Sequence, residues 1–288
     1  MFFKINKKRG ISSFQAIKQF AKANNIKKIG HAGTLDPLAE GLLIVATDED
    51  TKALHLLSSS SKEYIVEATL NKSSASYDEG EEIFEIKNPV TVTKLAMLSA
   101  IERIKNTTTQ IPPTFSAKKI NGVRSYHLAR TNREIILKPC DIKIFELELL
   151  DFDEQRQKFK IRTLVSKGTY IRSLIHDLGL LLNTDAVVNF LQRISIDKIK
   201  LENVDYVQIE NLDELFNIKI INLSAPELEF IFKNFKIIKN NENSKYERNI
   251  FVFNKLIIGW GHKELDNYHF EKIFLNRIER LIKEKNND

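Results

Sequence analysis

The amino-acid sequence predicts an α+β fold. Short segments with the two-residue period of strands are mixed with amphipathic segments of helical period, without strict strand–helix–strand alternation. Hydrophobic residues make up 42% of the 288 positions, which is enough to bury a substantial core. We therefore expect one large domain, alone or with a small appendage.

The N-terminal part of the chain is predicted to form a helix, a buried strand and a short helix. Ser12 and Ser13 can cap the first helix. Its apolar face would consist of Phe14, Ile17, Phe20 and Ala21. Leu42–Ala46 has the continuous apolar pattern of a buried strand, and Thr51–Leu57 is predicted to be a short helix.

A strand and an amphipathic helix follow. Lys62–Leu70 alternates between apolar and polar residues, as strands do. The apolar face of this strand would consist of Tyr64, Val66, Ala68 and Leu70. Thr93–Lys105 has helical spacing. Its apolar stripe would consist of Leu95, Leu98, Ile101 and Ile104.

The C-terminal part is predicted to contain further strands and one helix. Strands are expected near Asp141–Leu150 and Lys158–Val165. The turn at residues 166–168 leads into a helix that ends near Gly179 or at the leucines that follow it. Beyond Asn222 the composition changes, and residues 251–260 are predicted to form a strand pair.

Positive charge is concentrated in two segments. Residues 1–35 contain eight Lys or Arg residues and no acid, so Asp36 is the first acidic residue. Residues 112–138 contain six basic residues against Glu134 alone. Basic segments of this kind favour a polyanionic partner, because each neutralised phosphate releases condensed counterions. A general bias of the chain toward lysine is the alternative explanation.

Several classes of protein are disfavoured. Cys140 is the single cysteine, which excludes an internal disulfide and any multi-cysteine metal site. The six histidines lack metal-ligand spacing, so no metal or cofactor is expected. The chain has neither a long apolar run nor a secretory signal. We expect a cytoplasmic protein that does not contact a membrane.

The segment GHAGTLDPLAEG, residues 30–41, places Asp36 among three glycines and close to His31. These glycines permit tight turns with positive φ around a fixed acid. A carboxylate held in this way, directly after the most basic stretch, is a candidate reactive group. The alternative is structural: Asp36 could cap a helix whose first residue is Pro37.

A second segment, SKGTYIRSLIHDLG at residues 166–179, carries Tyr170 and Arg172. If residues 169–172 are extended, both side chains project to the same side, while Ile171 points into the core. An aromatic ring and a guanidinium presented together can stack on a base and hold a carboxylate. An ordinary surface Tyr–Arg pair is the alternative.

These segments together resemble the TruB family of tRNA pseudouridine-55 synthases. The resemblance begins with Lys7, Gly10 and Ser13 in a KxxGxxS-like pattern, followed by GHAGTLDPLAEG. It continues through KEY at residues 62–64, PPTFSA at residues 112–117, SKGTYIRSLIHDLG and LQR at residues 191–193. The blocks occur in family order and span roughly residues 4–196.

The resemblance implies a largely antiparallel sheet flanked by helices and an isomerase that needs no cofactor. Asp36 would be the nucleophile, attacking either C6 of uracil or C1′ of ribose. Arg172 would pair with Asp36 and keep it ionised, and Tyr64 would stack on the target base. Tyr170 and Leu191 would line the pocket.

The resemblance also implies how RNA is held. His31 would contact the nucleotides around the flipped base, although a structural histidine in a tight turn is the alternative. Residues 112–138 would form a thumb-like insertion. Its candidate phosphate contacts, each of which could instead be a solvated charge, are Lys118, Lys119, Arg124 and Arg130.

The predicted organisation is a catalytic domain at residues 1–225 and a short lobe at residues 226–288. This lobe would be a reduced form of the RNA-binding PUA domain or something unrelated. The partner would be the T-arm of tRNA, without a protein partner, and the chain would be a monomer. The rival functions are an isomerase acting on another RNA and an RNA-binding protein that no longer performs catalysis.

The sequence departs from the family pattern at two further places. Lys8 stands where the family usually has proline. Residues 73–80 read SSASYDEG, where the family segment is rich in Thr and Asp. Asp78 is retained there, and no role is carried over for the missing aspartate.

Overall fold

The computed structural model describes residues 1–57, 61–115, 119–120, 123–124, 137–234, 236–238, 248–264 and 267–285. A nine-stranded sheet dominates it, with its longest path in the order β11-β12-β4-β13-β3-β1-β15. The strands on this path are β1 (Phe2–Lys7), β3 (Glu40–Thr47), β4 (Lys62–Leu70), β11 (Ile144–Asp153), β12 (Lys158–Val165), β13 (Ala186–Ile196) and β15 (Tyr206–Ile209). Two strands pair beside it, β2 (Ile29–Ala32) with β3 and β14 (Ile199–Lys200) with β13. The predicted α+β fold with a largely antiparallel sheet is confirmed.

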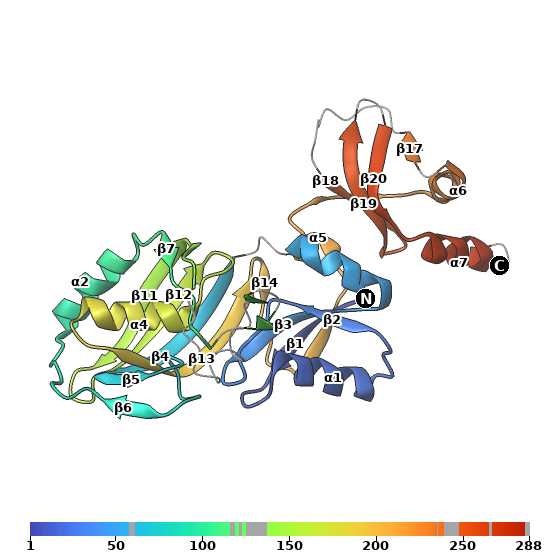
Figure 1. The fold of residues 1–288 in the computed structure, drawn as a ribbon. Helices are drawn as coiled ribbons and strands as arrows, with labels where there is room; N and C mark the ends of the chain where they lie inside the picture. The colour runs from blue at the N-terminus through green and yellow to red at the C-terminus, as the bar shows by residue number, and fades with distance from the viewer. Residues whose placement is uncertain are drawn as a thin grey trace.

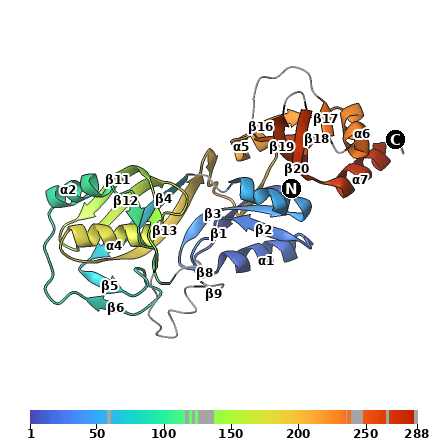
Figure 2. The same ribbon diagram turned by 45° about the horizontal axis from the view of Figure 1, so that its top comes forward.

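A smaller sheet follows, in the order β16-β18-β19-β20-β17. Its strands are β16 (Lys219–Asn222), β17 (Lys236–Ile238), β18 (Arg248–Phe253), β19 (Leu256–Glu264) and β20 (Asn267–Ile273). Three strand pairs lie outside both sheets: β5 (Lys72–Ser74) with β6 (Ile83–Glu85), β7 (Thr109–Gln110) with β10 (Cys140–Asp141), and β8 (Lys119–Ile120) with β9 (Val123–Arg124). The second sheet lies on the side of the first that carries β1, β2 and β3 (Figures 1 and 2).

Helices cover one face of the half of the large sheet that is formed by β11, β12, β4 and β13. The helices described are α1 (Ser13–Ala23), η1 (Asp48–Leu57, a 3-10 helix), α2 (Lys94–Ile104), α4 (Ile171–Leu181), α5 (Leu212–Leu215), α6 (Ala225–Asn234) and α7 (Leu275–Lys285). Figure 1 shows α2 and α4 on one face of the half formed by β11, β12, β4 and β13. Met97 of α2 and Leu174 of α4 belong to the same core cluster as Val66 and Ile161 of that half-sheet.

Strand β3 is buried on both faces, which explains its continuous apolar sequence. Leu43 and Val45 pack with Ile17 and Phe20 of α1. The alternate residues, represented by Ile44, belong to a cluster that includes the second sheet. The strand predicted from residues 42–46 therefore lies between the cluster that contains α1 and the cluster that includes the second sheet.

Two predicted helix faces are wrong in part. Ser12 caps α1 as expected, but Phe14 is 63% exposed because the buried face starts at Ser13 and Ala16. In α2, Leu95 and Leu98 are exposed. The residues of α2 that are buried are Met97, Ala100, Ile101 and Ile104.

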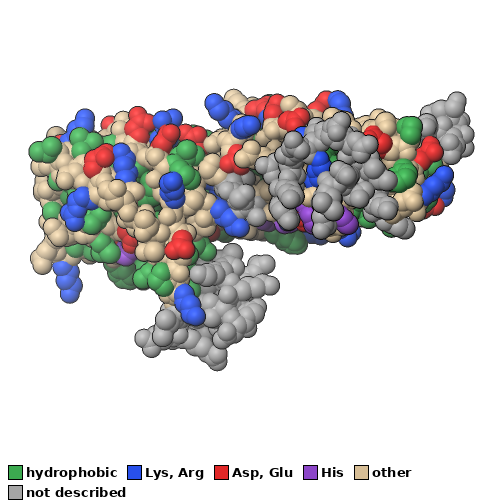
Figure 3. Space-filling model, turned by 90° about the horizontal axis from the view of Figure 1, so that it is seen from above, with side chains coloured by type: hydrophobic (Ala, Val, Ile, Leu, Met, Phe, Trp, Pro, Cys, Tyr) green, Lys and Arg blue, Asp and Glu red, His purple; other side chains and the backbone are tan. Residues whose placement is uncertain are grey.

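The remaining element predictions agree with the structure. The strand predicted for Lys62–Leu70 is β4, and the face predicted to be apolar is buried. The predicted pair at residues 251–260 corresponds to β18 and β19. In the described part of the chain, no helix is long and apolar enough to cross a membrane. On the face shown in Figure 3, basic and acidic side chains are interspersed.

Candidate active site

A cavity of about 380 Å³ opens beside the junction of β4 and β13. It is bounded by these strands, by the loop between β2 and β3, and by the first turn of α4. The residues that the sequence predicted for the pocket and that line this cavity are Asp36, Tyr64, Tyr170, Arg172 and Leu191. They come from four segments spread over more than half of the chain, so the fold is what brings them together.

The loop that carries Asp36 is fixed at both neighbours of this residue. Ser13 Oγ accepts a hydrogen bond from Leu35 N at 2.9 Å and lies 3.0 Å from Leu35 O. The carbonyl of Pro37 accepts hydrogen bonds from Gly10 N at 2.8 Å and from Lys7 Nζ at 3.4 Å. The three residues of the KxxGxxS-like pattern therefore hold the Asp36 loop in place.

No helix begins at Asp36, so the predicted alternative of a helix cap is wrong. Residues 37–38 form a turn, and Ala39 N donates to Asp36 O at 3.1 Å. Gly33 and Gly41 adopt positive φ, as expected, whereas Gly30 lies in β2 with an ordinary φ. A Cβ on Gly41 would lie 2.3 Å from the carbonyl oxygen of Arg193, so glycine is required where β3 approaches β13.

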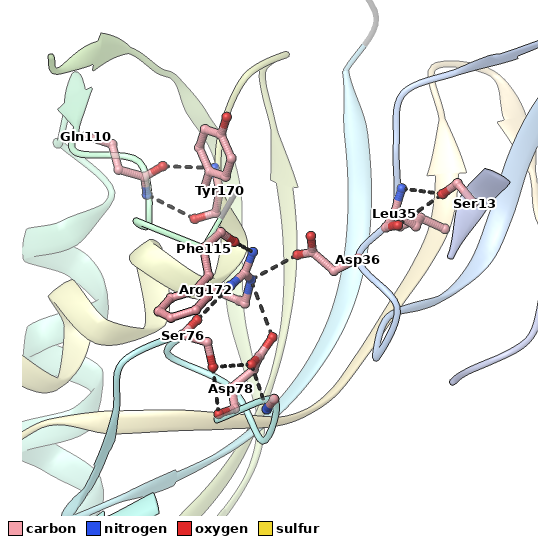
Figure 4. Close-up of polar contacts among 10 residues, drawn as sticks. Ser13, Leu35, Asp36, Ser76, Asp78, Gln110, Phe115, Tyr170 and Arg172 are labelled. Atoms are coloured by element: carbon pink, nitrogen blue, oxygen red, sulfur yellow. Dashed lines mark hydrogen bonds and ion pairs between the residues drawn. The ribbon is translucent and has the colours of Figure 1, made fainter. Parts of the chain in front are cut away.

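Arg172 forms polar contacts with several of the residues around the cavity (Figure 4). Its Nε donates to Asp36 Oδ2 at 2.9 Å. Its Nη1 donates to Ser76 O at 2.7 Å, and its Nη2 donates to Phe115 O at 2.8 Å. These bonds fix the plane of the guanidinium. The second oxygen of Asp36, Oδ1, accepts no hydrogen bond from the residues that the structure describes.

The start of α4 differs from the extended arrangement considered for residues 169–172. Tyr170 is the extended N-cap residue, and the helix begins at Ile171, which is buried as predicted. Arg172 therefore lies in the first helical turn. Gln110 holds this turn: its side chain donates to Tyr170 O at 3.1 Å and accepts from Tyr170 N at 2.8 Å.

Asp78 is a site residue to which the sequence assigned no role. Its Oδ2 lies 3.5 Å from Arg172 Nε. Its Oδ1 accepts from Ser76 Oγ at 2.5 Å and from Gly80 N at 2.9 Å. The retained aspartate within an otherwise divergent segment was the signal that could have identified it.

The opposite wall of the cavity is basic. Arg193 is almost fully buried and donates from Nε to Leu42 O at 2.8 Å and from Nη2 to Gly33 O at 2.9 Å. Burial, followed by the charge of Arg193, lowers the pKa of Lys62 to about 8. Burial also lowers the pKa of Lys7 to about 8. Lys62 lines the cavity, whereas Lys7 does not and donates from Nζ to the backbone carbonyl of Ile11 at 2.7 Å.

His31 does not line the cavity. It lies on β2 opposite Val45 of β3. Burial, followed by Arg193, lowers its pKa, which favours the neutral imidazole. Its Nδ1 is buried and has no hydrogen-bond partner among the described residues.

The predicted phosphate contacts fall on the segment between residues 115 and 137, of which the structure describes little. Lys118 and Arg130 lie outside the residues that the structure describes. Lys119 and Arg124 pair in the backbone of β8 and β9, but their side chains are not described. Their contacts with RNA stay a prediction.

Comparison with known proteins identifies the family. Residues 21–171 match the family described as TruB family pseudouridylate synthase (N terminal domain), which is more than half of the chain. The chain belongs to this TruB family. Pseudouridylate synthases isomerise uridine to pseudouridine, so this TruB-family protein is an RNA-modifying isomerase.

Two relatives match the protein over nearly its full length. A protein named tRNA pseudouridine synthase B from Mycoplasma mobile is 37% identical over 288 residues, covering 100% of this chain and 99% of the relative. A protein of the same name from Mycoplasmopsis pulmonis is 40% identical, covering 99% of this chain and 100% of the relative.

Solved structures share the fold at low sequence identity. A chain in a crystal structure of a Cbf5–Nop10–Gar1 complex matches with a TM-score of 0.67 at 18% identity, covering 94% of this chain and 84% of that one. A chain in an archaeal box H/ACA Nop10–Cbf5 complex matches with a TM-score of 0.65 at 17% identity, covering 94% and 85%. The shared fold thus extends over both sheets of the TruB-family chain.

Proposed function

We propose that this protein isomerises uridine 55 in the T-loop of tRNA to pseudouridine, with Asp36 as the nucleophile. The observation that carries the proposal is the arrangement of Asp36 and Arg172. Asp36 Oδ2 accepts from a buried guanidinium, while the carboxylate remains 37% exposed in the cavity. The relatives named tRNA pseudouridine synthase B support tRNA as the substrate.

The reaction breaks the bond between N1 of uracil and C1′ of ribose and forms a bond between C5 and C1′. Asp36 Oδ1 attacks either C6 of the base or C1′ of the sugar and is later released. The base rotates between the two steps, C5 loses its proton, and N1 gains one. No oxidant, reductant or group donor enters this balance.

Arg172 performs its role by orientation. It holds Oδ2 of Asp36 and is itself held by the carbonyls of Ser76 and Phe115. Because these contacts are all made within the protein, Oδ1 would be presented to the cavity without reorganisation. A fixed geometry of this kind lowers the entropic part of the activation barrier.

The cavity walls are proposed to hold the uracil. Tyr64, from β4, would stack on the base, and Leu191, from β13, would close the apolar side. Tyr170 would contribute to the same wall from the start of α4. We propose that His31 acts outside this cavity, where its neutral imidazole would contact the opened loop.

The remaining parts of the proposal concern RNA binding. Residues 112–138 would close over the T-arm, with phosphate contacts from Lys118, Lys119, Arg124 and Arg130. Residues 226–288 would form a reduced RNA-binding lobe. Affinity for tRNA should therefore fall steeply with salt, and a flat dependence would contradict the phosphate contacts. Action as a cytoplasmic monomer stays a prediction.

Tritium release tests the proposed reaction. Transcribed tRNA carrying tritium at C5 of uridine is incubated with the protein, and a transcript with cytidine at position 55 serves as the control. We expect release that is stoichiometric with the first transcript and absent from the control. Equal release from both transcripts would move the target to another uridine, and no release from either would refute the tRNA assignment.

A further inference from the structure

We infer that Tyr77 and His176 are positioning residues for the reaction, because their stacked rings fix the turn that orients Arg172. The turn comprises residues 75–80 and lies between β5 and β6. This inference rests on the proposed function for its kinetic consequences. The contacts on which it is built are independent of that function.

Helix α4 presents two side chains to the turn. Arg172 and His176 are four residues apart, so they lie on one face of the helix. Arg172 binds the carbonyl of Ser76, and the ring of His176 stacks on Tyr77, the next residue. The ring centroids are 4.0 Å apart, with an angle of 10° between the planes.

Tyr77 has an unfavourable backbone conformation that other contacts must stabilise. Its φ is +62°, a value that a bulky residue seldom adopts. Its neighbours Ser76 and Asp78 both contact Arg172, one through a carbonyl and the other through a carboxylate. A relaxation of φ at Tyr77 would therefore move both groups relative to the guanidinium.

The turn is also attached to the sheet at Tyr77. Tyr77 N donates to Ser74 O at 3.1 Å, and Tyr77 O accepts from Val188 N of β13 at 3.0 Å. These backbone contacts fix the path of the chain on both sides of the strained residue. The stacked ring is the side-chain contact that holds the same residue against α4.

His176 is anchored on its other side. Its Nδ1 donates to Asp185 Oδ1 at 2.7 Å, and the same oxygen accepts from Ala186 N, the first residue of β13. Burial, followed by the carboxylates of Asp185 and Asp177, raises the pKa of Tyr77. The stacked phenol therefore stays uncharged at neutral pH.

This chain of contacts connects β13 with the reacting acid. It runs from Asp185 through His176 and Tyr77 to the turn, and from the turn through Arg172 to Asp36. Neither Tyr77 nor His176 lines the cavity. Both act through Arg172, so their loss should affect catalytic rate and leave RNA affinity unchanged.

The test compares single-turnover rates, measured with the enzyme in saturating excess over tRNA, and dissociation constants for tRNA, measured by titration. Tyr77→Ala and His176→Ala should lower the rate about tenfold or more, since small displacements of a catalytic group cost large factors in rate. His176→Phe retains a flat ring and should restore most of the rate. Tyr206→Ala serves as a matched control, because it removes a ring contact with Phe20 on the β15 side of the sheet.

A glycine variant separates the ring from the backbone strain. Tyr77→Gly accepts the positive φ without the ring, so it should fold and lose less rate than Tyr77→Ala. Rates of Tyr77→Ala and His176→Ala within about twofold of wild type would overturn the inference. Equal losses in His176→Phe and His176→Ala would also overturn it, because stacking would then not carry the effect.

Crystal structures keep the inference testable if the proposed function fails. If wild type releases no tritium from tRNA, the proposed function fails while the structural claim is still measured. The inference predicts that in His176→Ala the Ser76 carbonyl leaves Arg172 Nη1, ending the 2.7 Å contact. An unchanged turn and an unchanged Arg172 in that variant would refute the inference whatever the activity.

Discussion

Two buried arginines in this protein each pair with an aspartate. Arg172, in the first turn of α4, contacts Asp36 at 2.9 Å, and Arg277 of α7 contacts Asp50 of η1 at 2.7 Å. The arginine side chains are similarly buried, at 5% and 4% exposure. Each also donates to backbone carbonyl oxygen, Arg172 at Ser76 and Arg277 at Ile257.

The two aspartates differ in what they leave exposed. The side chain of Asp36 is 37% exposed, and one of its oxygens accepts a hydrogen bond from the described residues. The side chain of Asp50 is 3% exposed. Both oxygens of Asp50 are occupied, Oδ1 by Arg277 and Oδ2 by the amine of Met1 at 2.5 Å. Asp50 therefore joins the two sheets and has no oxygen left for a substrate.

The comparison shows that the pairing by itself does not make a reactive acid. An arginine–aspartate pair forms a structural link where the carboxylate is enclosed. The same kind of pair provides a candidate catalytic group where the carboxylate faces a cavity. The fold decides between them, because α7 packs over Asp50 while the loop between β2 and β3 leaves Asp36 open. Variants at four positions would break or sharpen this comparison.

The largest change in rate among the arginine and glutamine variants is expected for Arg172→Ala. Without the guanidinium, Asp36 loses its fixed orientation, so the single-turnover rate should fall by about 100-fold or more. The dissociation constant for tRNA should change by less than about threefold, since Arg172 is buried and binds Asp36 and two backbone carbonyls of the protein.

Arg172→Lys is the matched control for that variant. Lysine keeps the positive charge but cannot bind Asp36, Ser76 and Phe115 in one plane, so it should rescue little of the rate. Comparable losses of rate and affinity in Arg172→Ala would show that Arg172 works mainly in binding.

Asp50→Asn should show the opposite pattern. Arg277 would keep its ion pair with Glu49 but lose its buried anionic partner, which costs at most roughly 3–5 kcal/mol in the free energy of unfolding. Thermal or urea denaturation measures this loss. At a temperature where the variant is folded, its rate per folded molecule should equal that of wild type. A stable but inactive Asp50→Asn would contradict the structural role of this pair.

Gln110→Ala should lower the rate less than Arg172→Ala does and lower the stability less than Asp50→Asn does. It removes two hydrogen bonds to the backbone of Tyr170, leaving the start of α4 less well fixed. We expect a rate about tenfold lower and a loss of roughly 1–3 kcal/mol in stability. Gln110→Glu keeps the acceptor for Tyr170 N and should be intermediate. A rate for Gln110→Ala equal to that of wild type would show that Gln110 does not influence the site.

The sequence predicted the residues that line the cavity better than those that support it. Asp36, Tyr64 and Arg172 lie in motifs that can be recognised from a few neighbouring positions. Asp78 and Gln110 contact the site through segments far from those motifs. Nothing in their local sequence indicates which residue they meet.

The helix faces illustrate the same limit. The apolar pattern of α2 allows two overlapping stripes, one through Leu95 and Leu98 and another through Met97 and Ala100. Periodicity places a helix there but does not choose between stripes one residue apart. Packing against the large sheet and α4 makes the choice, and it buries the second stripe.

The most direct test of the central claim is the single-turnover rate of Asp36→Asn. Asparagine keeps the shape of the side chain and removes the nucleophilic carboxylate. We expect a folded protein with wild-type affinity for tRNA and a rate lower by at least about 1000-fold. A variant that forms pseudouridine at a rate near that of wild type would contradict the claim that Asp36 is the nucleophile.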